Sequence, residues 1–395
     1  MSLASQVSAV VRMNVKSIGQ RFWPSLSTVV AVMLVVLVLL SFLAMANGFQ
    51  QTIRGAGRDD VAIVLRAGAT TELNSGLSRD QVRLLGEGPG VAHDANGDAL
   101  LSPELFVIAD GKKKATGLKA NLPLRGIGAA GAGLRDNLKI AEGRMFASGS
   151  NELVVGRGVQ REFENFDLGS KVTLGKSQWV VVGIFETGGS VFESELWADL
   201  PVVQSLFNRT AAVQTVRAKL DGPDGLQKFK DYATNDPRLK LDVLSETQYF
   251  SDQASQTSGL IQYLGWPLAI AMAFGALAGA LNTMYSAVLS RTREIATLRA
   301  IGYGGFPAFV GTLVESLVLA AVGGCIGALA AWIFFDGLSA TTLGASFTQV
   351  VFKFEMSPKL VEQGLVLGMA IGLIGGLLPA FRAARVPIIA GLAER

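Results

Sequence analysis

Four long apolar runs, separated by polar segments, dominate the hydrophobic pattern of this 395-residue chain. The first extends from Phe22 to Ile53 without a charged residue, and the others cover about 266–289, 309–335 and 360–378. A helix needs about 20 apolar residues to cross a hydrocarbon core of roughly 30 Å, so each run is long enough for one transmembrane helix. We predict transmembrane helices over residues 23–48, 260–290, 306–335 and 360–381.

The segment between the first two runs has a different pattern, which predicts a folded domain with its stalks over residues 49–259. Charged residues return there, Gly, Asp and Asn recur, and short β-branched or alternating segments are typical of strands. The predicted strands are 60–65, 105–109, 153–155, 171–174, 179–185, 213–220 and 239–244, and the predicted helices are 78–85, 200–208 and 225–234. The expected fold class is an α-helical membrane protein with four transmembrane helices and an α+β extracytoplasmic domain inserted between the first and second spans.

The basic residues predict the orientation of the chain. Three Lys or Arg residues occur in each of the segments 1–21, 290–305 and 382–395, whereas the loop 336–359 has two that are balanced by two acids. Short loops rich in Lys and Arg stay in the cytoplasm, so we expect both termini, the tail 382–395 and residues 291–305 there. The loop and the inserted domain are then external. Residues 1–22 also have apolar residues at helical spacing, which predicts an amphipathic helix on the inner surface of the membrane.

A short charged island, residues 290–302, separates the second and third apolar runs. Ile295, Leu298 and Ile301 are spaced by three residues, which places them on one face of a helix. The basic residues of the island are Arg291, Arg293 and Arg299. Gly302 follows at the position where a residue with positive φ commonly ends a helix. The arginines alone would suit a topology signal, but the apolar stripe and the helix end favour a surface helix that is offered to a cytoplasmic partner.

The island and its surroundings resemble the FtsX/MacB-type ABC transporter permeases. Arg293-Glu-Ile-Ala-Thr-Leu-Arg-Ala-Ile-Gly302, followed by Glu315 and a glycine-containing run, is similar to the coupling helix and the next span of that family. Three segments resemble its periplasmic core domain, and they are 152–156, 168–174 and 179–185. Residues 379–392 resemble its C-terminal end, so the resemblance covers nearly the whole chain.

This resemblance implies a permease subunit whose partner, a separate ATPase subunit, binds ATP and Mg and docks on residues 291–305. The implied coupling residues are Arg291, Arg293, Glu294, Ile295, Leu298, Arg299 and Gly302, with Ile295 and Leu298 entering an apolar groove of the ATPase. The resemblance also implies a homodimer in the bacterial inner membrane that passes motion to its periplasmic residues 49–259. In MacB-like members this motion drives efflux with a periplasmic adaptor and an outer-membrane channel. Extraction of lipoproteins and FtsX-like regulation of a cell-wall hydrolase are the alternatives.

Several kinds of site do not fit the residues of this chain. One cysteine and one histidine exclude a disulfide framework, a thiolate metal site and an HExxH motif, so we predict no metal-binding or catalytic residues. Gly169 and the segment Gly175-Lys176-Ser177 suggest a P-loop. However, the gap between the two glycines is one residue longer than the motif requires, and strand-like segments flank Gly175. We predict a hairpin turn there, and no cofactor in this chain. A net charge of +3 gives no indication of nucleic-acid binding.

Two further features lie inside the predicted spans. Glu315 is the only Asp, Glu, Lys or Arg of the third span, and a carboxylate in lipid is costly unless it has a partner. We expect it to bond to Asn282, to Tyr285 or to the arginines of the island, although a direct functional role is the alternative. A row of glycines in the fourth span predicts a face for close helix packing, and its members are Gly364, Gly368, Gly372 and Gly376.

Overall fold

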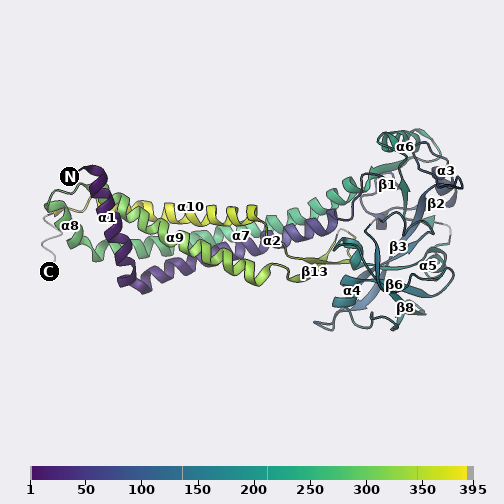
Figure 1. The fold of residues 1–395 in the computed structure, drawn as a ribbon, viewed down its shortest axis with the longest axis horizontal. Coiled ribbons are helices and arrows are strands. Elements are labelled where there is room, and N and C mark those ends of the chain that lie inside the picture. Colours follow the sequence, from purple (N-terminus) through teal and green to yellow (C-terminus); the bar gives the residue numbers. More distant parts are fainter. Residues whose placement is uncertain (1, 136, 211, 345, 389–395) are drawn as a thin grey trace. The chain divides into compact units, whose positions relative to one another are not determined.

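The structure, a computed structural model, describes residues 2–135, 137–210, 212–344 and 346–388, and it consists of two units (Figure 1). The helical unit contains the described residues up to Asn47, together with Leu260–Leu338 and those from Phe354 onward. The external unit contains Gly48–Gly259 and Ser339–Lys353. Two long helices run without a break from one unit into the other, and they are α2 (Phe22–Arg54) and α7 (Glu246–Ser290).

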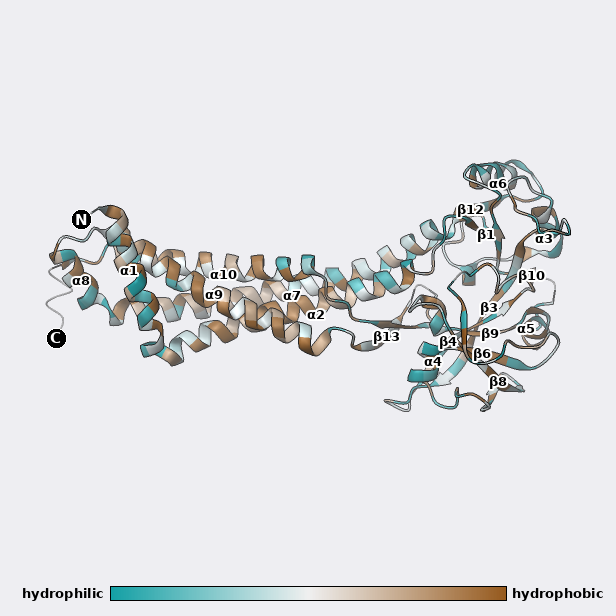
Figure 2. Ribbon diagram, viewed as in Figure 1, coloured by the Kyte–Doolittle hydropathy of each residue, from teal (hydrophilic) through white to brown (hydrophobic). Residues whose placement is uncertain are grey.

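Among the described residues, four helices are long and apolar enough to cross a membrane, as the sequence predicts. Besides α2 and α7 they are α9 (Gly305–Phe335) and α10 (Pro358–Ala384), and hydrophobic residues predominate along the middle of these helices in Figure 2. Three short elements complete the helical unit, namely α1 (Leu3–Ser17), the 3₁₀ helix η1 (Ile18–Arg21) and α8 (Thr292–Ala300). Part of the predicted tail, residues 389–395, lies outside the described residues.

The helices pack through apolar side chains at the centre and glycines at the closest approaches. Val32 and Val36 of α2 are fully buried in a cluster with Ala276 of α7, Ala328 of α9 and Ile371 of α10. The glycine row of α10 lies against α2 and α9 of the same chain. A Cβ atom at Gly372 would lie 2.3 Å from that of Ala320. The row therefore sets the spacing of helices within one chain.

The external unit is built on a mixed ten-stranded sheet with the order β12-β1-β11-β3-β4-β9-β6-β8-β5, in which β7 also pairs with β8. Its first strands are β1 (Val61–Arg66), β3 (Leu101–Lys112), β4 (Lys119–Ile127), β5 (Lys139–Gly143) and β6 (Glu152–Gly156). The others are β7 (Lys171–Leu174), β8 (Ser177–Glu186), β9 (Leu196–Asp199), β11 (Thr215–Lys219) and β12 (Leu241–Ser245). A separate pair joins β2 (Leu77–Ser78) to β10 (Ala212–Val213).

Short helices pack around this sheet. They are η2 (Glu72–Asn74), α3 (Arg79–Gly86), α4 (Arg157–Glu162), η3 (Val191–Ser194), α5 (Leu200–Leu206) and α6 (Gly225–Asn235). A continuous apolar core, which includes the fully buried Trp179 and Phe229, holds the layers together. The result is the α+β domain that the sequence predicts between the first and second spans.

Every strand and helix predicted for this domain overlaps an observed one. The segment suggesting a P-loop is the β7–β8 hairpin, with Leu174 opposite Ser177. The prediction missed β2, β4, β5 and β9, because β4 contains Pro123, which lacks a backbone donor, and the other three are short or polar.

The predicted external loop 336–359 also contains unexpected structure. It forms a hairpin of β13 (Ser339–Leu343) and β14 (Gln349–Lys353), which belongs to the external unit. The Val351 amide donates to the Ser194 hydroxyl at 2.9 Å, and the Lys113 ammonium donates to the Thr341 hydroxyl at 2.6 Å.

Candidate functional site

Helix α8, between the second and third spans, has a well-defined C-terminal end. It begins after Arg291, where φ is −107° and ψ is 8°, and it ends before Gly302, where φ is +102°. The Tyr303 amide donates to the Leu298 carbonyl at 3.0 Å, and the Gly302 amide donates to the Arg299 carbonyl at 3.1 Å. This pair of bonds is a Schellman motif, which satisfies the last carbonyl groups of the helix. The predicted helix end at Gly302 is therefore confirmed.

The two faces of α8 have different surroundings. Ile295 is only 8% exposed and packs with Ala296, with Val288 of α7, with Ala383 of α10 and with Val386 just after α10. The opposite face is exposed, and its residues are Arg293, Glu294, Thr297, Ala300 and Ile301. The predicted insertion of Ile295 into a groove of another protein therefore does not agree with the structure, because this side chain already fills a groove of its own chain.

The three arginines of the island do not form a single basic face, because their side chains have different surroundings. Arg293 is exposed, whereas Arg291 is only 6% exposed and turns toward the spans. Arg299 donates to the backbone carbonyl of Val386, which ties α8 to the segment after α10. Only Arg293 presents its guanidinium on the open face of α8 together with Ile301. The sequence could not distinguish these environments, because they depend on helices distant along the chain.

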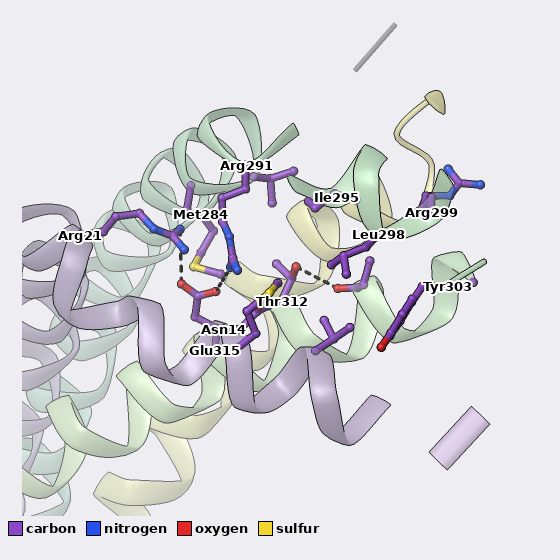
Figure 3. A pocket seen from close by; sticks show the side chains of 16 residues that line it. Asn14, Arg21, Met284, Arg291, Ile295, Leu298, Arg299, Tyr303, Thr312 and Glu315 are labelled. Carbon is purple, nitrogen blue, oxygen red and sulfur yellow. Dashed lines mark hydrogen bonds and ion pairs between the residues drawn. The ribbon is translucent and has the colours of Figure 1, made fainter. Parts of the chain in front are cut away.

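Glu315 of α9 lies between two arginines from different elements (Figure 3). Its carboxylate is 3.6 Å from Arg21 Nη1, at the end of η1, and 3.4 Å from Arg291 Nη1. The expected bond to an arginine of the island is thus present, and Arg21 is a partner that the sequence did not reveal. Asn282 lies on the exposed side of α7, and no described bond joins it to Glu315. The carboxylate connects η1, α8 and α9.

The N-terminal helix α1 packs closely on α9 at the same end of the unit. A Cβ atom at Gly311 would lie 2.8 Å from Val10 and 2.9 Å from Asn14, and both of these residues are buried. A cavity of about 20 Å³ lies between α1, α7, α8 and α9, and Arg21, Arg291, Ile295, Leu298 and Glu315 are among the residues that line it. Leu3 and Val15 of α1 stay exposed. The predicted amphipathic helix is therefore present, with one face on α9.

The external unit contains a buried ionic cluster that the sequence did not predict. Its members are Glu72, Glu104, Arg125, Arg135, Glu195, Arg217 and Glu246, all at most 6% exposed. Arg125 bonds to three carboxylates of the cluster at 2.7 to 2.9 Å. Arg217 contacts Glu72 at 3.2 Å and Glu104 at 3.0 Å, and it also bonds to Glu246. The sequence feature that could have indicated this cluster is a charged residue within an otherwise apolar strand, such as Arg125 or Arg217.

Charge pairing and aromatic rings stabilise the ionised forms in this cluster. Burial opposes ionisation of Glu104, but the three arginines outweigh it and lower the pKa of Glu104 to about 2. Burial, which Glu104 partly offsets, lowers the pKa of Arg135 to about 10. The Arg135 guanidinium lies 4.8 Å from the ring centre of Trp197 and 4.8 Å from that of Phe192, within cation–π distance. Glu104 and Arg135 are thus both held charged at neutral pH inside the domain.

Comparison with protein-family models shows what kind of protein carries these features. The model of the MacB-like periplasmic core domain matches residues 25–235, more than half of the chain, and that of the FtsX-like permease C-terminal region matches residues 267–388. The chain belongs to the FtsX/MacB-type ABC transporter permeases. The sequence-based family resemblance is therefore confirmed.

Curated relatives of this permease are distant. The uncharacterized ABC transporter permease YknZ of Bacillus subtilis (strain 168) is 26% identical over 65% of this chain and 66% of its own length. The macrolide export ATP-binding/permease protein MacB of Rhodopseudomonas palustris (strain HaA2) is 24% identical over 70% of this chain and 44% of its own length. The permease thus spans less than two thirds of the length of either relative. The crystal structure of the periplasmic region of MacB from Actinobacillus actinomycetemcomitans is 15% identical, with a TM-score of 0.37, and the match covers 53% of this chain and 96% of that one.

The described part of the permease offers no group of three or more His, Cys, Asp or Glu side chains that could hold a metal ion. Its charged clusters instead join elements to each other. One connects η1, α8 and α9 through Glu315, and the other connects α7 to the external sheet through Glu246.

Proposed function

We propose that this chain is the permease subunit of an ABC system in which a separate ATPase subunit, with ATP and Mg, acts on α8. The observation that carries the proposal is the structure of α8. This helix has a hydrogen-bonded C-terminal end, an exposed outer face, and an inner face that is bonded to its own chain. Its outer face offers the exposed Ile301, 69% accessible, beside Arg293 and Thr297. Its inner face is bonded to α9 through Arg291 and to the end of α10 through Arg299.

Three contacts support the proposal that a push on α8 reaches the external unit. Ile295 and Ala296 pack on Val288, close to the end of α7, so displacement of α8 would move this helix. Helix α7 is continuous from Ser290 back to Glu246, where it joins the ionic cluster of the external sheet. A helix carries displacement along its axis because successive turns are hydrogen-bonded, and α7 stays helical through Pro267, where one such bond is missing because proline has no N–H. ATP-driven closure of the ATPase subunits would thus become motion of the external domain.

The proposal includes a homodimer in the bacterial inner membrane, with both termini cytoplasmic and residues 49–259 periplasmic. The glycines of α7 support the dimer, because Gly275 and Gly279 have no neighbouring atom within 4 Å, unlike the glycine row of α10. The exposed Phe274 lies beside them. Small residues let helices approach closely in lipid, so this face of α7 suits a second copy. The relatives named for macrolide export support export of a substrate, with an adaptor and an outer-membrane channel as further partners.

The test of ATPase docking is co-purification of the cognate ATPase with full-length variants of this permease. Ile301→Asp places a charge where an apolar anchor is expected, and loss of such an anchor commonly costs 2 kcal/mol or more. We expect at least a tenfold loss of ATPase recovery with Ile301→Asp, and a smaller, salt-dependent loss with Arg293→Ala.

Gln20→Asp serves as the control, because Gln20 is exposed in η1 and outside α8. This variant should recover as much ATPase as the wild type. Undiminished recovery with Ile301→Asp, after equal membrane insertion has been verified, would exclude the open face of α8 as the docking site.

A further inference from the structure

A cavity of about 40 Å³ lies within the external unit, beside the buried ionic cluster. The end of α2, the first turns of α7, the sheet and the β13–β14 hairpin surround it. Glu72, Arg125 and Glu195 of the cluster line it, together with Tyr249 of α7 and Gln349 of β14. Apolar side chains from α2 and the sheet form much of the remaining lining. A cavity of this volume has room for roughly three water-sized particles.

The ionic cluster has one more acidic group than basic groups. Its seven buried members are four glutamates and three arginines, and four negative charges against three positive ones give a formal charge of −1. The described lining of the cavity has the same imbalance, because Glu72 and Glu195 both bond to Arg125, its one basic residue. Burial opposes ionisation of Glu72, but Arg125 and Arg217 outweigh it and lower the pKa of Glu72. A buried charge without a counter-charge is costly, so this cavity favours a cation.

Oxygen atoms with unused acceptor capacity belong to the side chains that line the same cavity. Gln349 is only 9% exposed, and its Oε1 has no hydrogen-bond partner among the described residues. Each of the carboxylates of Glu72 and Glu195 accepts three hydrogen bonds from described residues, whereas a carboxylate has about four acceptor sites. The Tyr249 hydroxyl accepts a bond from the Glu72 amide at 3.2 Å. A buried acceptor without a partner is costly, so Gln349 Oε1 also favours a ligand that is a cation or a donor.

We propose that this cavity binds one small monovalent cation, of the class of Na⁺, K⁺ or ammonium. Gln349 Oε1 and the remaining acceptor sites of Glu72 and Glu195 supply its oxygen ligands, and the Tyr249 hydroxyl and water complete them. One positive charge balances the cluster. A divalent ion would exceed this balance, and Ca²⁺ takes about six to eight oxygen ligands. Because Gln349 belongs to β14 and Tyr249 to α7, the bound ion fastens the hairpin and the first turns of α7 to the sheet.

The test is hydrogen exchange of the purified full-length chain in detergent, measured by mass spectrometry. Sodium, potassium and ammonium chloride are each compared with N-methyl-D-glucamine chloride at equal ionic strength, because this organic cation is too large for the cavity. We expect residues 346–353 of the hairpin to exchange about tenfold more slowly with at least one of the small cations. Gln349→Met removes the amide oxygen but keeps the length of the side chain, and Gln349→Asn withdraws the amide by one methylene. Both variants should abolish the difference between the salts.

Gln227→Met is the control, because Gln227 is exposed on α6 and does not line the cavity, so this variant should keep the cation dependence of the wild type. Exchange of strand β3 in the same samples verifies that each variant keeps the sheet.

Four results would overturn the proposal. The first is equal exchange of the wild type in all four salts, which would indicate that only water enters the cavity. The second is an unchanged cation dependence in Gln349→Met or Gln349→Asn. The third is its loss in Gln227→Met, which would indicate a general effect of the salts. The fourth is stronger protection by magnesium chloride at equal ionic strength, which would indicate a divalent site. No ATPase is present, so these results are independent of docking at α8.

Discussion

Glu246, the first residue of α7, accepts a hydrogen bond from the fully buried guanidinium of Arg217 in strand β11. The helix that contains the second span therefore begins inside the ionic cluster of the external sheet. The next turn adds two contacts: the Tyr249 hydroxyl accepts from the Glu72 amide at 3.2 Å, and the Phe250 ring lies 5.7 Å from the Arg217 guanidinium. The first turn of α7 is thus attached to the sheet.

Removing one member of this cluster should destabilise the external unit strongly. Arg217→Met leaves Glu246 and Glu104 buried without one of their cations, and breaking a buried ion pair from one side costs about 3–5 kcal/mol. The free energy of unfolding can be measured by denaturant titration of the full-length chain, with the fluorescence of the buried Trp179 and Trp197 as the signal.

The control for this measurement is Arg83→Gln, because Arg83 and Glu87 form an exposed pair on α3. Exposed pairs of this spacing contribute about 0.5 kcal/mol or less, so the control should unfold nearly as the wild type does. Equal stability of Arg217→Met and Arg83→Gln would show that the cluster adds nothing to the fold.

The same cluster predicts a loss of stability in acid. The pKa of Glu104 is lowered to about 2 in the folded chain, below its value near 4.3 in an unfolded one. A carboxylate with a lowered pKa contributes its full stability above the unfolded value and loses it as the pH falls toward the folded value. We expect the external unit to lose roughly 3 kcal/mol between about pH 4.5 and pH 2 from this group.

Denaturant titrations of the wild type and of Glu104→Gln across this pH range check the assignment. The variant should be less stable at pH 7 but should have a shallower dependence on pH, because it cannot take up the proton. Parallel curves for the two proteins would assign the acid sensitivity to other carboxylates.

The glycines of α10 and α7 should respond differently to the same small substitution. Gly372→Ala would place a methyl group 2.3 Å from Ala320 of α9 and force the two helices apart, whereas Gly275 has open space around it. Overpacking of a tight contact typically costs 1–3 kcal/mol, so Gly372→Ala should lower the thermal stability of the detergent-solubilised chain. Gly275→Ala should leave the stability of the single chain unchanged. Equal stability of both variants would show that the α9–α10 contact adapts freely.

Several features of this permease depend on local properties and could therefore be predicted from its sequence. The length of an apolar run decides whether a helix can cross a membrane, and this is sufficient to locate the four spans. Alternating and β-branched segments located seven strands of the inserted domain, and a glycine able to adopt positive φ marked the end of α8 at Gly302. Each of these features depends on residues that are neighbours along the chain.

The direction in which α8 faces depends on residues far away in the sequence. An apolar stripe such as Ile295 and Leu298 predicts that this side of a helix is covered, but it does not identify the covering surface. Packing brings Ala383 and Val386 against Ile295, so this end of the stripe points into its own chain, whereas Ile301, the last residue of the predicted stripe, is exposed. The sequence therefore predicted Ile295 as a docking residue because it shows that this side of α8 is covered but not that its own chain covers it.

The ionic cluster of the external unit also could not be predicted from local sequence, because its partners are distant along the chain. Its seven charges come from segments between Glu72 and Glu246 and meet because the sheet places β11 between β1 and β3, with β4 beside β3. A charged residue in an apolar strand can be exposed at an edge or paired in a core, and its local sequence is the same in both cases. Only the tertiary structure decides between them, because the energy of a buried charge depends on the partners and the dielectric surroundings that distant segments provide.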